Sequence, residues 1–171
     1  MTTFTPIEQA EFVAAIHTLA AALAEDDWKP DFIIGVGRGG LAPAVFLSHA
    51  TGLPMLSVDY SSQVKDFADE PLVKLARRTQ GGERLLFLDD INDSGRTIAH
   101  LRAKLADSDA VPGSIRFATL IDNVSSSQTV EYRARTIDRR VTKDWFIFPW
   151  EAVAPDAVIA QDSAAVPERI A

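Results

Sequence analysis

Apolar residues near the start of the chain recur with the period of an amphipathic helix. One face of this stretch carries Phe12, Ile16, Leu19 and Leu23, a spacing that is typical of a helix buried on one side. The preceding residues Thr5-Pro6-Ile7-Glu8 have the form of a capping box with proline in the first turn. The pattern therefore predicts a helix that begins near Thr5 and packs one face against the core.

Short continuous apolar runs then alternate with further helical patterns. The expected strands are residues 31–36, 55–59, 84–88 and 115–121, and the expected helices are residues 41–51, 71–78 and 97–106. Extended segments follow within residues 130–150, and the Ala-rich tail after Pro155 is expected to be an edge element or a mobile end. This alternation is typical of an α/β domain with a mainly parallel twisted sheet flanked by helices. Ligands of such sheets bind outside the carboxyl ends of the strands.

Composition narrows the class of protein and its partners. The chain has 171 residues, of which 47% are apolar, so we expect one soluble globular domain over residues 1–171. No apolar run approaches the roughly 20 residues that span a membrane, and the N-terminus lacks the features of a signal peptide. The formal charge of −7 argues against nucleic acid and membranes as partners, and the absence of cysteine excludes disulfides. These observations predict a cytoplasmic protein.

The stretch from Leu85 to Thr97 carries the clearest chemical pattern. A buried strand is expected to end in the adjacent acids Asp89 and Asp90, and Asp93 and a Ser-Gly-Arg-Thr turn follow before a helix. Carboxylates bind ribose hydroxyls or a hydrated metal, while backbone N–H groups at a helix N-terminus bind phosphate. The pattern therefore predicts a site for a sugar phosphate. Paired acids after a strand also occur as metal sites of other enzymes and as solvated loop charges, so these alternatives stay open.

A glycine-rich turn, Gly35-Val-Gly-Arg-Gly-Gly40, lies between the first expected strand and the following helix. With Asp59 at the end of the next strand, it matches the fingerprint of dinucleotide-binding oxidoreductases. That interpretation leaves Asp89–Thr97 without a role, and the fingerprint usually lies nearer the start of a domain. The alternative is a loop that binds pyrophosphate through backbone N–H groups, because glycine permits close approach and Arg38 adds positive charge.

Together these motifs resemble the type I phosphoribosyltransferases. The acidic stretch resembles the family's signature, a hydrophobic run followed by Asp/Glu-Asp-x-x-Asp-Thr-Gly-Gly-Thr, with Ser94 and Arg96 as departures. Gly37-Arg38-Gly39-Gly40 is similar to the pyrophosphate loop of the bacterial xanthine-guanine enzymes, and residues 144–151 resemble the base-pocket segment of 6-oxopurine enzymes. The resemblance spans residues 28–151. It implies the type I phosphoribosyltransferase fold, a mainly parallel sheet with a small hood formed by terminal segments.

The resemblance also implies roles for individual residues. Asp89 and Asp90 would hold the ribose hydroxyls and Mg²⁺, and Asp93, expected in an exposed loop, would act as the general acid/base. The residues implied in binding the 5′-phosphate are Asp93, Ser94, Gly95, Arg96 and Thr97. Those implied in binding pyrophosphate are Gly37, Arg38, Gly39, Gly40 and Arg77. Those implied in binding the base are Asn123, Trp145 and Phe146.

Three of these assignments have open alternatives. Asn123 stands where the family has a lysine that donates to the purine's exocyclic oxygen, so the identity of the base is left open. The amide of Asn123 could instead point to solvent, with the donor supplied by Gln128 or Arg133. Arg77 is equally well explained as a solvated cation near a helix end, and Phe146 as a core residue together with its aromatic neighbours.

The function implied is Mg²⁺-dependent transfer of a phosphoribosyl group from phosphoribosyl diphosphate to a purine or purine-like base. Pyrophosphate would be released, as in nucleobase salvage, and the protein is expected to form a homo-oligomer, either a dimer or a tetramer. A second class stays open, namely a regulator that binds phosphoribosyl diphosphate or a nucleotide without turnover. A dinucleotide-binding oxidoreductase is the third alternative.

Overall fold

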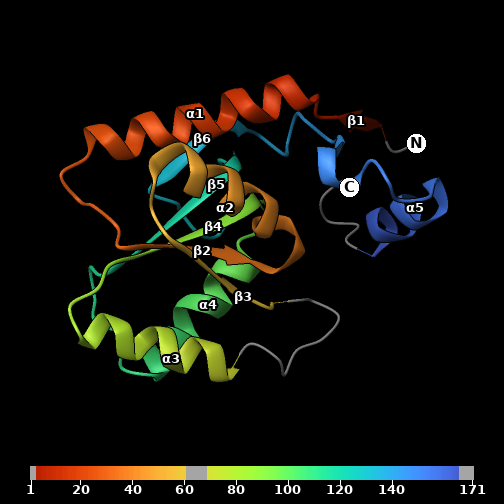
Figure 1. Ribbon diagram of the computed structural model, residues 1–171. Coiled ribbons are helices and arrows are strands. Elements are labelled where there is room, and N and C mark those ends of the chain that lie inside the picture. The colour runs from red at the N-terminus through yellow and green to blue at the C-terminus, as the bar shows by residue number, and fades with distance from the viewer. Residues whose placement is uncertain (1–2, 61–68, 166–171) are drawn as a thin grey trace.

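Five strands form a central, fully parallel sheet in the order β3-β2-β4-β5-β6 (Figure 1). The computed structural model describes residues 3–60 and 69–165. The strands of this sheet are β2 (Phe32–Val36), β3 (Met55–Val58), β4 (Leu85–Asn92), β5 (Ile115–Asn123) and β6 (Tyr132–Ile137). The predicted α/β class and parallel sheet are therefore confirmed. β4 runs four residues further than predicted, so that it includes the acids Asp89 and Asp90.

Helices cover both faces of the sheet, as Figure 1 shows. α1 (Gln9–Glu25) and α2 (Gly37–Thr51) pack on one face, and α3 (Asp69–Gln80) and α4 (Arg96–Asp107) pack on the other. Within the parts of the chain that the structure describes, no helix is both long enough and apolar enough to cross a membrane.

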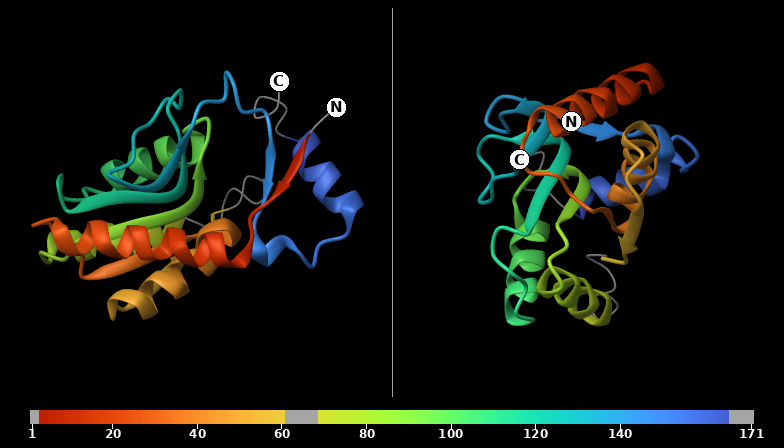
Figure 2. Two further views of the ribbon diagram at one scale, coloured as in Figure 1. Left: turned by 90° about the horizontal axis from the view of Figure 1, so that it is seen from above. Right: turned by 60° about the vertical axis from the view of Figure 1, so that its left-hand side comes forward.

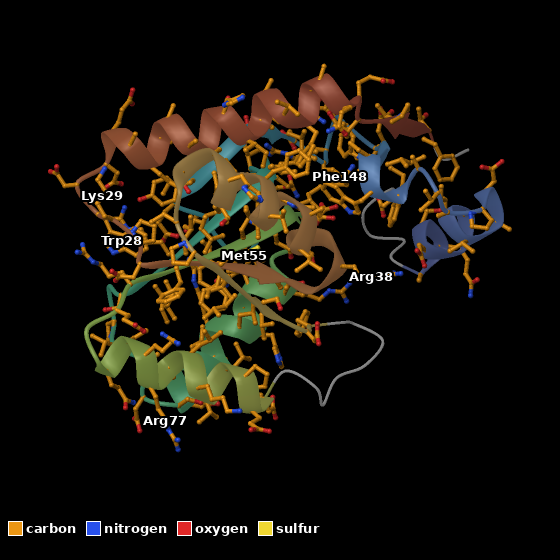
Figure 3. All side chains as sticks on the ribbon, viewed as in Figure 1. Trp28, Lys29, Arg38, Met55, Arg77 and Phe148 are labelled. Carbon is orange, nitrogen blue, oxygen red and sulfur yellow. The ribbon has the colours of Figure 1, made fainter. Side chains whose placement is uncertain are left out.

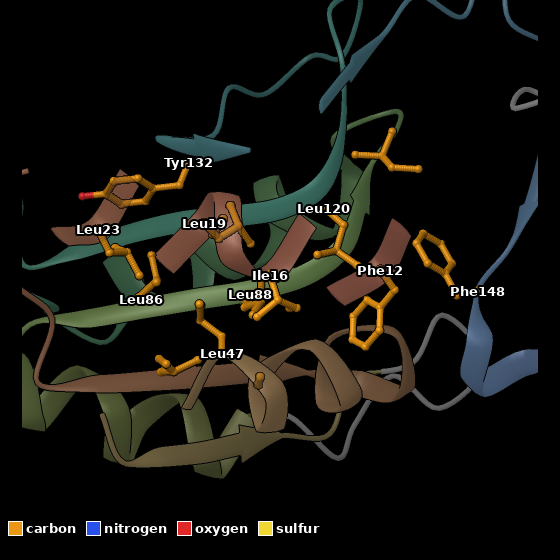
Figure 4. Packing of buried hydrophobic residues seen from close by; sticks show 14 of the residues in the cluster. Phe12, Ile16, Leu19, Leu23, Leu47, Leu86, Leu88, Leu120, Tyr132 and Phe148 are labelled. Atoms are coloured by element: carbon orange, nitrogen blue, oxygen red, sulfur yellow. The ribbon is translucent and has the colours of Figure 1, made fainter. Parts of the chain in front are cut away.

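The hydrophobic core is divided by the sheet, because successive strand residues point to opposite faces. Leu86 and Leu88 of β4 pack with α1 and α2, whereas Leu85 and Phe87 pack with α3 and α4. The predicted apolar face of α1 is confirmed, since all four of its residues are buried against the first of these clusters (Figure 4). The alternation along β4 matters for the site, because it also directs Asp89 and Asp90 to opposite faces.

Segments from the two ends of the chain form a second, smaller unit, which we call the hood (Figure 2). It consists of β1 (Phe4–Pro6), the parallel strand β7 (Trp145–Ile147), the 3₁₀ turn η1 (Pro149–Glu151) and α5 (Asp156–Ala164). The expected hood is thus present, and the tail after Pro155 forms a helix.

The predicted capping box at Thr5 is wrong. Thr5 lies in β1, and its hydroxyl donates to Asp144 Oδ2 at 2.6 Å instead of capping a helix. α1 begins later, at Gln9, after an N-cap residue that makes no side-chain capping bond. Pairing with a strand from the far end of the chain therefore prevailed over the local capping motif.

The division of the core predicts how truncations affect stability. Leu19 is fully buried in α1, so Leu19→Ala should lower the free energy of unfolding by about 2–5 kcal/mol by leaving a cavity. Val153 is 91% exposed, and Val153→Ala should change the free energy of unfolding by less than about 0.5 kcal/mol. Chemical denaturation of both variants tests the assignment. Equal losses would contradict the placement of α1 on the core.

Candidate active site

The glycine-rich turn and the acidic strand end lie side by side because β2 and β4 are neighbours in the sheet. The turn forms the start of α2, with Gly37 at a φ of +54°. A Cβ atom on Gly39 would lie 2.6 Å from Asp90 Oδ2, and one on Gly40 would meet the carbonyl oxygen of Leu88. A side chain at Gly40 would have no room, and one at Gly39 would have to displace the Asp90 carboxylate. Two motifs about 50 residues apart are therefore in direct contact, as the prediction of one shared site requires.

The strand order argues against a dinucleotide-binding fold. In that fold, the third strand pairs with the second, giving the order 3-2-1-4. Here β4, which is the third strand of the sheet along the chain, pairs with β2 on the side opposite β3. The topological switch point therefore lies between β2 and β4, where the glycine turn and the acids meet. The sheet of this protein therefore lacks the strand order of the dinucleotide-binding oxidoreductases, and the glycine turn has to be explained in another way.

The two adjacent acids are half-buried at the carboxyl end of β4. The Asp90 N–H donates to Asp89 Oδ1 at 3.0 Å, and the Ile91 N–H donates to Asp90 Oδ1 at 2.6 Å. Because their side chains leave opposite faces of the strand, only Asp90 faces the glycine turn.

Asp93 was predicted to lie in an exposed loop, and this prediction is wrong. Its side chain is buried and paired with Arg139. Arg139 Nε lies 3.0 Å from Oδ1 and 3.1 Å from Oδ2 of Asp93, and Nη2 lies 2.9 Å from Oδ2. Both residues are less than one-tenth exposed. Arg139 is not among the residues predicted from the sequence, since it lies 46 residues from Asp93 in a polar loop without a local motif.

The amide of Asn123 forms hydrogen bonds within the protein and does not line the recess described below. Its Nδ2 donates to the carbonyl of Asp93 at 3.0 Å. Its Oδ1 accepts from the N–H and hydroxyl of Ser125 and from the N–H of Arg139. The expected contact of Asn123 with the base is therefore corrected, because these bonds hold three loops together. The alternative donors Gln128 and Arg133 are also engaged, with Arg102 and Asp122 respectively.

The predicted phosphate turn precedes α4. Gly95 is the N-cap residue, with a φ of +87°, and no side chain caps the helix. Arg96 and Thr97 form the first turn. The turn is supported from behind by the loop after β5, where the Ser127 hydroxyl donates to the carbonyl of Ser94 at 2.8 Å. The N-terminus of α4 therefore presents backbone donors at the same sheet edge as the acids.

A small recess, with a cavity volume of about 30 Å³, lies between the end of β4 and the hood, lined by Asp90, Ile91, Arg139, Trp145, Phe146, Phe148 and Glu151. Burial raises the pKa of the Glu151 carboxyl above its usual range, and the negative charges of Asp90 and Asp162 raise it further. Trp145 and Phe146, both predicted to bind the base, lie in its wall.

The aromatic residues of this segment divide between recess and core. Phe148 and Trp150 stack on each other with ring centroids 4.8 Å apart, and Trp150 packs edge-on against Phe12. Trp150 therefore belongs to the core packing, whereas Phe148 is part of the core and also lines the recess. The guanidinium groups of Arg135 and Arg139 lie 5.0 and 5.4 Å from the ring centre of Phe146.

Arg77 is not brought to the glycine turn. The buried face of α3 consists of Leu72, Leu75, Ala76 and Thr79, which leaves Arg77 exposed on the outer side. Figure 3 shows its side chain pointing away from Arg38, which lies at the end of α2 nearer the hood. The predicted pyrophosphate contact of Arg77 is therefore corrected, and the alternative of a solvated cation fits this position.

Comparisons with known proteins agree with this arrangement. The chain is 28% identical over 125 residues to the xanthine-guanine phosphoribosyltransferase of Idiomarina loihiensis, which covers 70% of each chain. A purine phosphoribosyltransferase from Pyrococcus horikoshii has a similar structure, with a TM-score of 0.64, 28% identity, and coverage of 88% of this chain and 96% of that one. A hypothetical protein from Neisseria gonorrhoeae with bound ppGpp shares the fold, with a TM-score of 0.69, 21% identity, and coverage of 96% and 98%.

The same result follows from comparison with whole families. The model of the phosphoribosyl transferase domain matches residues 6–155. This match includes the glycine turn, the acidic strand end, the phosphate turn and the aromatic segment at the recess. The chain therefore belongs to the phosphoribosyltransferase family.

Proposed function

We propose that the protein transfers the 5-phosphoribosyl group of phosphoribosyl diphosphate to a purine base and releases pyrophosphate. The observation that carries the proposal is the contact of Gly39 with Asp90, which joins the glycine turn at the start of α2 to the acidic end of β4 at the switch point. The recess beside Asp90 is a place for the base, with Trp145 as an aromatic wall. Similarity to relatives named for xanthine, guanine and purine transfer supports the choice of base class.

Each part of the donor substrate has a proposed partner. The backbone donors at the start of α4 would hold the 5′-phosphate, and those of the glycine turn of α2 would hold the pyrophosphate beside Arg38. Asp89 and Asp90 would accept hydrogen bonds from the ribose hydroxyls between these two anion sites. Positioning of this kind accounts for much of the rate of a group transfer, because it fixes both ends of the breaking bond.

The proposal includes Mg²⁺, and the residues fit a particular kind of magnesium site. Among residues 3–60 and 69–165, no group of three or more acidic, histidine or cysteine side chains is arranged to enclose a metal. Mg²⁺ commonly binds one or two carboxylates and completes its shell with water and substrate phosphates. Asp90, with Asp89, would hold it in that way. When bound, the ion neutralises charge on the departing pyrophosphate.

In the transfer itself, the bond between C1′ and the pyrophosphate oxygen breaks and a ring nitrogen of the base forms the new bond to C1′. The proton on that nitrogen must then leave, and Asp93 is our proposed acceptor. Both Asp93 oxygens already accept from Arg139, so the base N–H would bind to a remaining lone pair of one of them. The proton then resides on the Asp93 carboxyl until solvent removes it.

A second candidate function is regulation by nucleotide binding without turnover. Two observations favour it, namely the engagement of Asp93 by Arg139 and the ppGpp bound to the similar Neisseria gonorrhoeae protein. A purine nucleotide carrying phosphates would use the same recess and the same helix starts. The two candidates differ in whether a bond is broken.

We expect pyrophosphate release when the protein is mixed with phosphoribosyl diphosphate, Mg²⁺ and a purine base. A coupled pyrophosphate assay with hypoxanthine, guanine, xanthine and adenine measures it, and mixtures without a base provide the background. Release that depends on the base supports the transferase. Tight binding of phosphoribosyl diphosphate with no release for any base would favour the regulator.

Phosphoribosyl diphosphate with Mg²⁺ should raise the melting temperature, since a ligand that binds only the folded state stabilises it. At about 100 times the dissociation constant the gain is about 2.7 kcal/mol. Differential scanning fluorimetry measures the shift, and EDTA should remove most of it. Nicotinamide dinucleotides serve as the control and should give no comparable shift. Unchanged melting at millimolar phosphoribosyl diphosphate would argue against both candidates.

Asp93→Asn should lower turnover by about 10²–10⁴-fold, the usual contribution of a general acid or base. It should also reduce stability by roughly 3–5 kcal/mol, because Arg139 is left buried without its counter-charge. The matched control is Asp138→Asn, which removes a partly exposed carboxylate paired with Arg140 and should leave turnover unchanged. Steady-state kinetics on folded protein measures the effect. Near-normal turnover in Asp93→Asn would remove Asp93 from the mechanism.

A further inference from the structure

Thr119 is a polar residue in the middle of the buried strand β5. Its side chain is fully buried, with an exposed fraction of 0%. Within the part of the chain that the structure describes, its hydroxyl oxygen has no hydrogen-bond partner. A buried hydroxyl without a partner is unfavourable, because folding removes its hydrogen bonds to water and replaces them with none. Valine has nearly the same shape and would avoid this cost, so the hydroxyl calls for an explanation.

Thr119 lies next to Asp89 in the central sheet. The two residues are paired in the register of β4 and β5, two positions after the pair Phe87 and Phe117. The rings of that preceding pair stack with their centroids 5.3 Å apart, so both point to the same face of the sheet. Because side chains alternate along a strand, Asp89 and Thr119 also share this face. Neighbouring strands lie about 4.7–4.9 Å apart, a spacing that a hydroxyl and a carboxylate can bridge with one hydrogen bond.

The neighbour on the other side of Thr119 is a cation and cannot accept its proton. Arg133 of β6 is paired with Thr119 in the register, and a guanidinium carries N–H donors only. Arg133 itself donates to the carbonyl of Val130 at 2.9 Å and forms an ion pair with Asp122 at 3.6 Å. Of the two side chains that flank Thr119 in the register, the carboxylate of Asp89 is therefore the one that can accept its hydroxyl.

We propose that Thr119 positions Asp89 when phosphoribosyl diphosphate binds. The inference rests on the proposed function, in which Asp89 accepts a hydrogen bond from a ribose hydroxyl. In the structure, Asp89 Oδ1 accepts the N–H of Asp90 at 3.0 Å, and the Thr119 hydroxyl does not hold the carboxylate. On binding, a small rotation of the carboxylate brings one of its oxygens to this hydroxyl, and its other lone pairs stay available to the ribose. A group held by a second hydrogen bond keeps its orientation toward the substrate.

Two conservative substitutions separate positioning from packing. Thr119→Val removes the hydroxyl and keeps the branched shape, whereas Thr119→Ser keeps the hydroxyl and removes a methyl group. Isothermal titration calorimetry with phosphoribosyl diphosphate and Mg²⁺ measures the dissociation constant, and urea denaturation measures the stability of the unliganded protein. Thr119→Val should bind about tenfold more weakly at unchanged or higher stability, because it loses a hydrogen bond to a charged group but no partner in the unliganded protein. Thr119→Ser should bind like the wild type although it is less stable, because the lost methyl group leaves a cavity.

Thr79 offers a matched control, since it is a buried threonine whose hydroxyl has partners. It is 1% exposed, donates to the carbonyl of Ala76 at 2.6 Å and accepts the N–H of Val111 at 2.8 Å. Thr79→Val should therefore lose stability and keep the wild-type dissociation constant, because α3 carries this residue away from the proposed site.

A merely structural Thr119 gives the opposite order, in which the variant that loses more stability also binds more weakly. Equal affinities of the wild type and Thr119→Val overturn the proposal, and so does a lower stability of Thr119→Val than of Thr119→Ser. A crystal structure of the wild-type complex is the direct check. It should place Thr119 Oγ1 about 2.5–3.0 Å from a carboxylate oxygen of Asp89, and a complex without this contact also overturns the proposal.

The same titration distinguishes failure of this inference from failure of the proposed function. A wild-type protein that does not bind phosphoribosyl diphosphate contradicts the proposed function, and the inference falls with it. Normal binding by the wild type together with normal binding by Thr119→Val contradicts the inference alone. Absence of pyrophosphate release bears on turnover and leaves both dissociation constants readable.

Discussion

The contact between the first turn of α2 and the carboxyl end of β4 is the constraint on which the site depends. Gly40 lies so close to the backbone of β4 that a side chain there would force the two elements apart, and a side chain on Gly39 would displace the carboxylate of Asp90. This approach is possible only because β4 is inserted beside β2 in the sheet. The same order places α4, and with it the phosphate turn, directly beyond the acids. Strand order thus determines the spacing of the anion sites.

A second constraint joins the carboxyl end of β4 to the hood. Arg139 donates to Asp93 at the end of β4 and to the carbonyls of Thr142 and Asp144 just before β7. One side chain therefore connects the edge of the central sheet with the hood. A buried ion pair of this kind contributes less to stability than to a defined arrangement, because desolvation offsets much of the attraction between its charges.

Local patterns predicted most of the elements and the motif positions. Periodicity and turn residues are properties of neighbouring residues, so strands, helices, the glycine turn and the stretch Asp89–Thr97 could be found without a structure. Features that depend on distant partners could not. Thr5 fits a capping box in isolation, but its hydroxyl meets Asp144, 139 residues away. The direction of Arg77 follows from which face of α3 is apolar and from where that face packs.

The hood has a consequence for the order in which the molecule is completed during synthesis. β1 is made first, yet its partner β7 follows about 140 residues later, after every strand of the central sheet. Pairings between such distant segments form late, because the intervening chain must first be brought together. A nascent chain that has emerged only as far as β6 carries both proposed anion-binding turns and the acids between them, but no hood. The recess between β4 and the hood is therefore the last part of the proposed site to form.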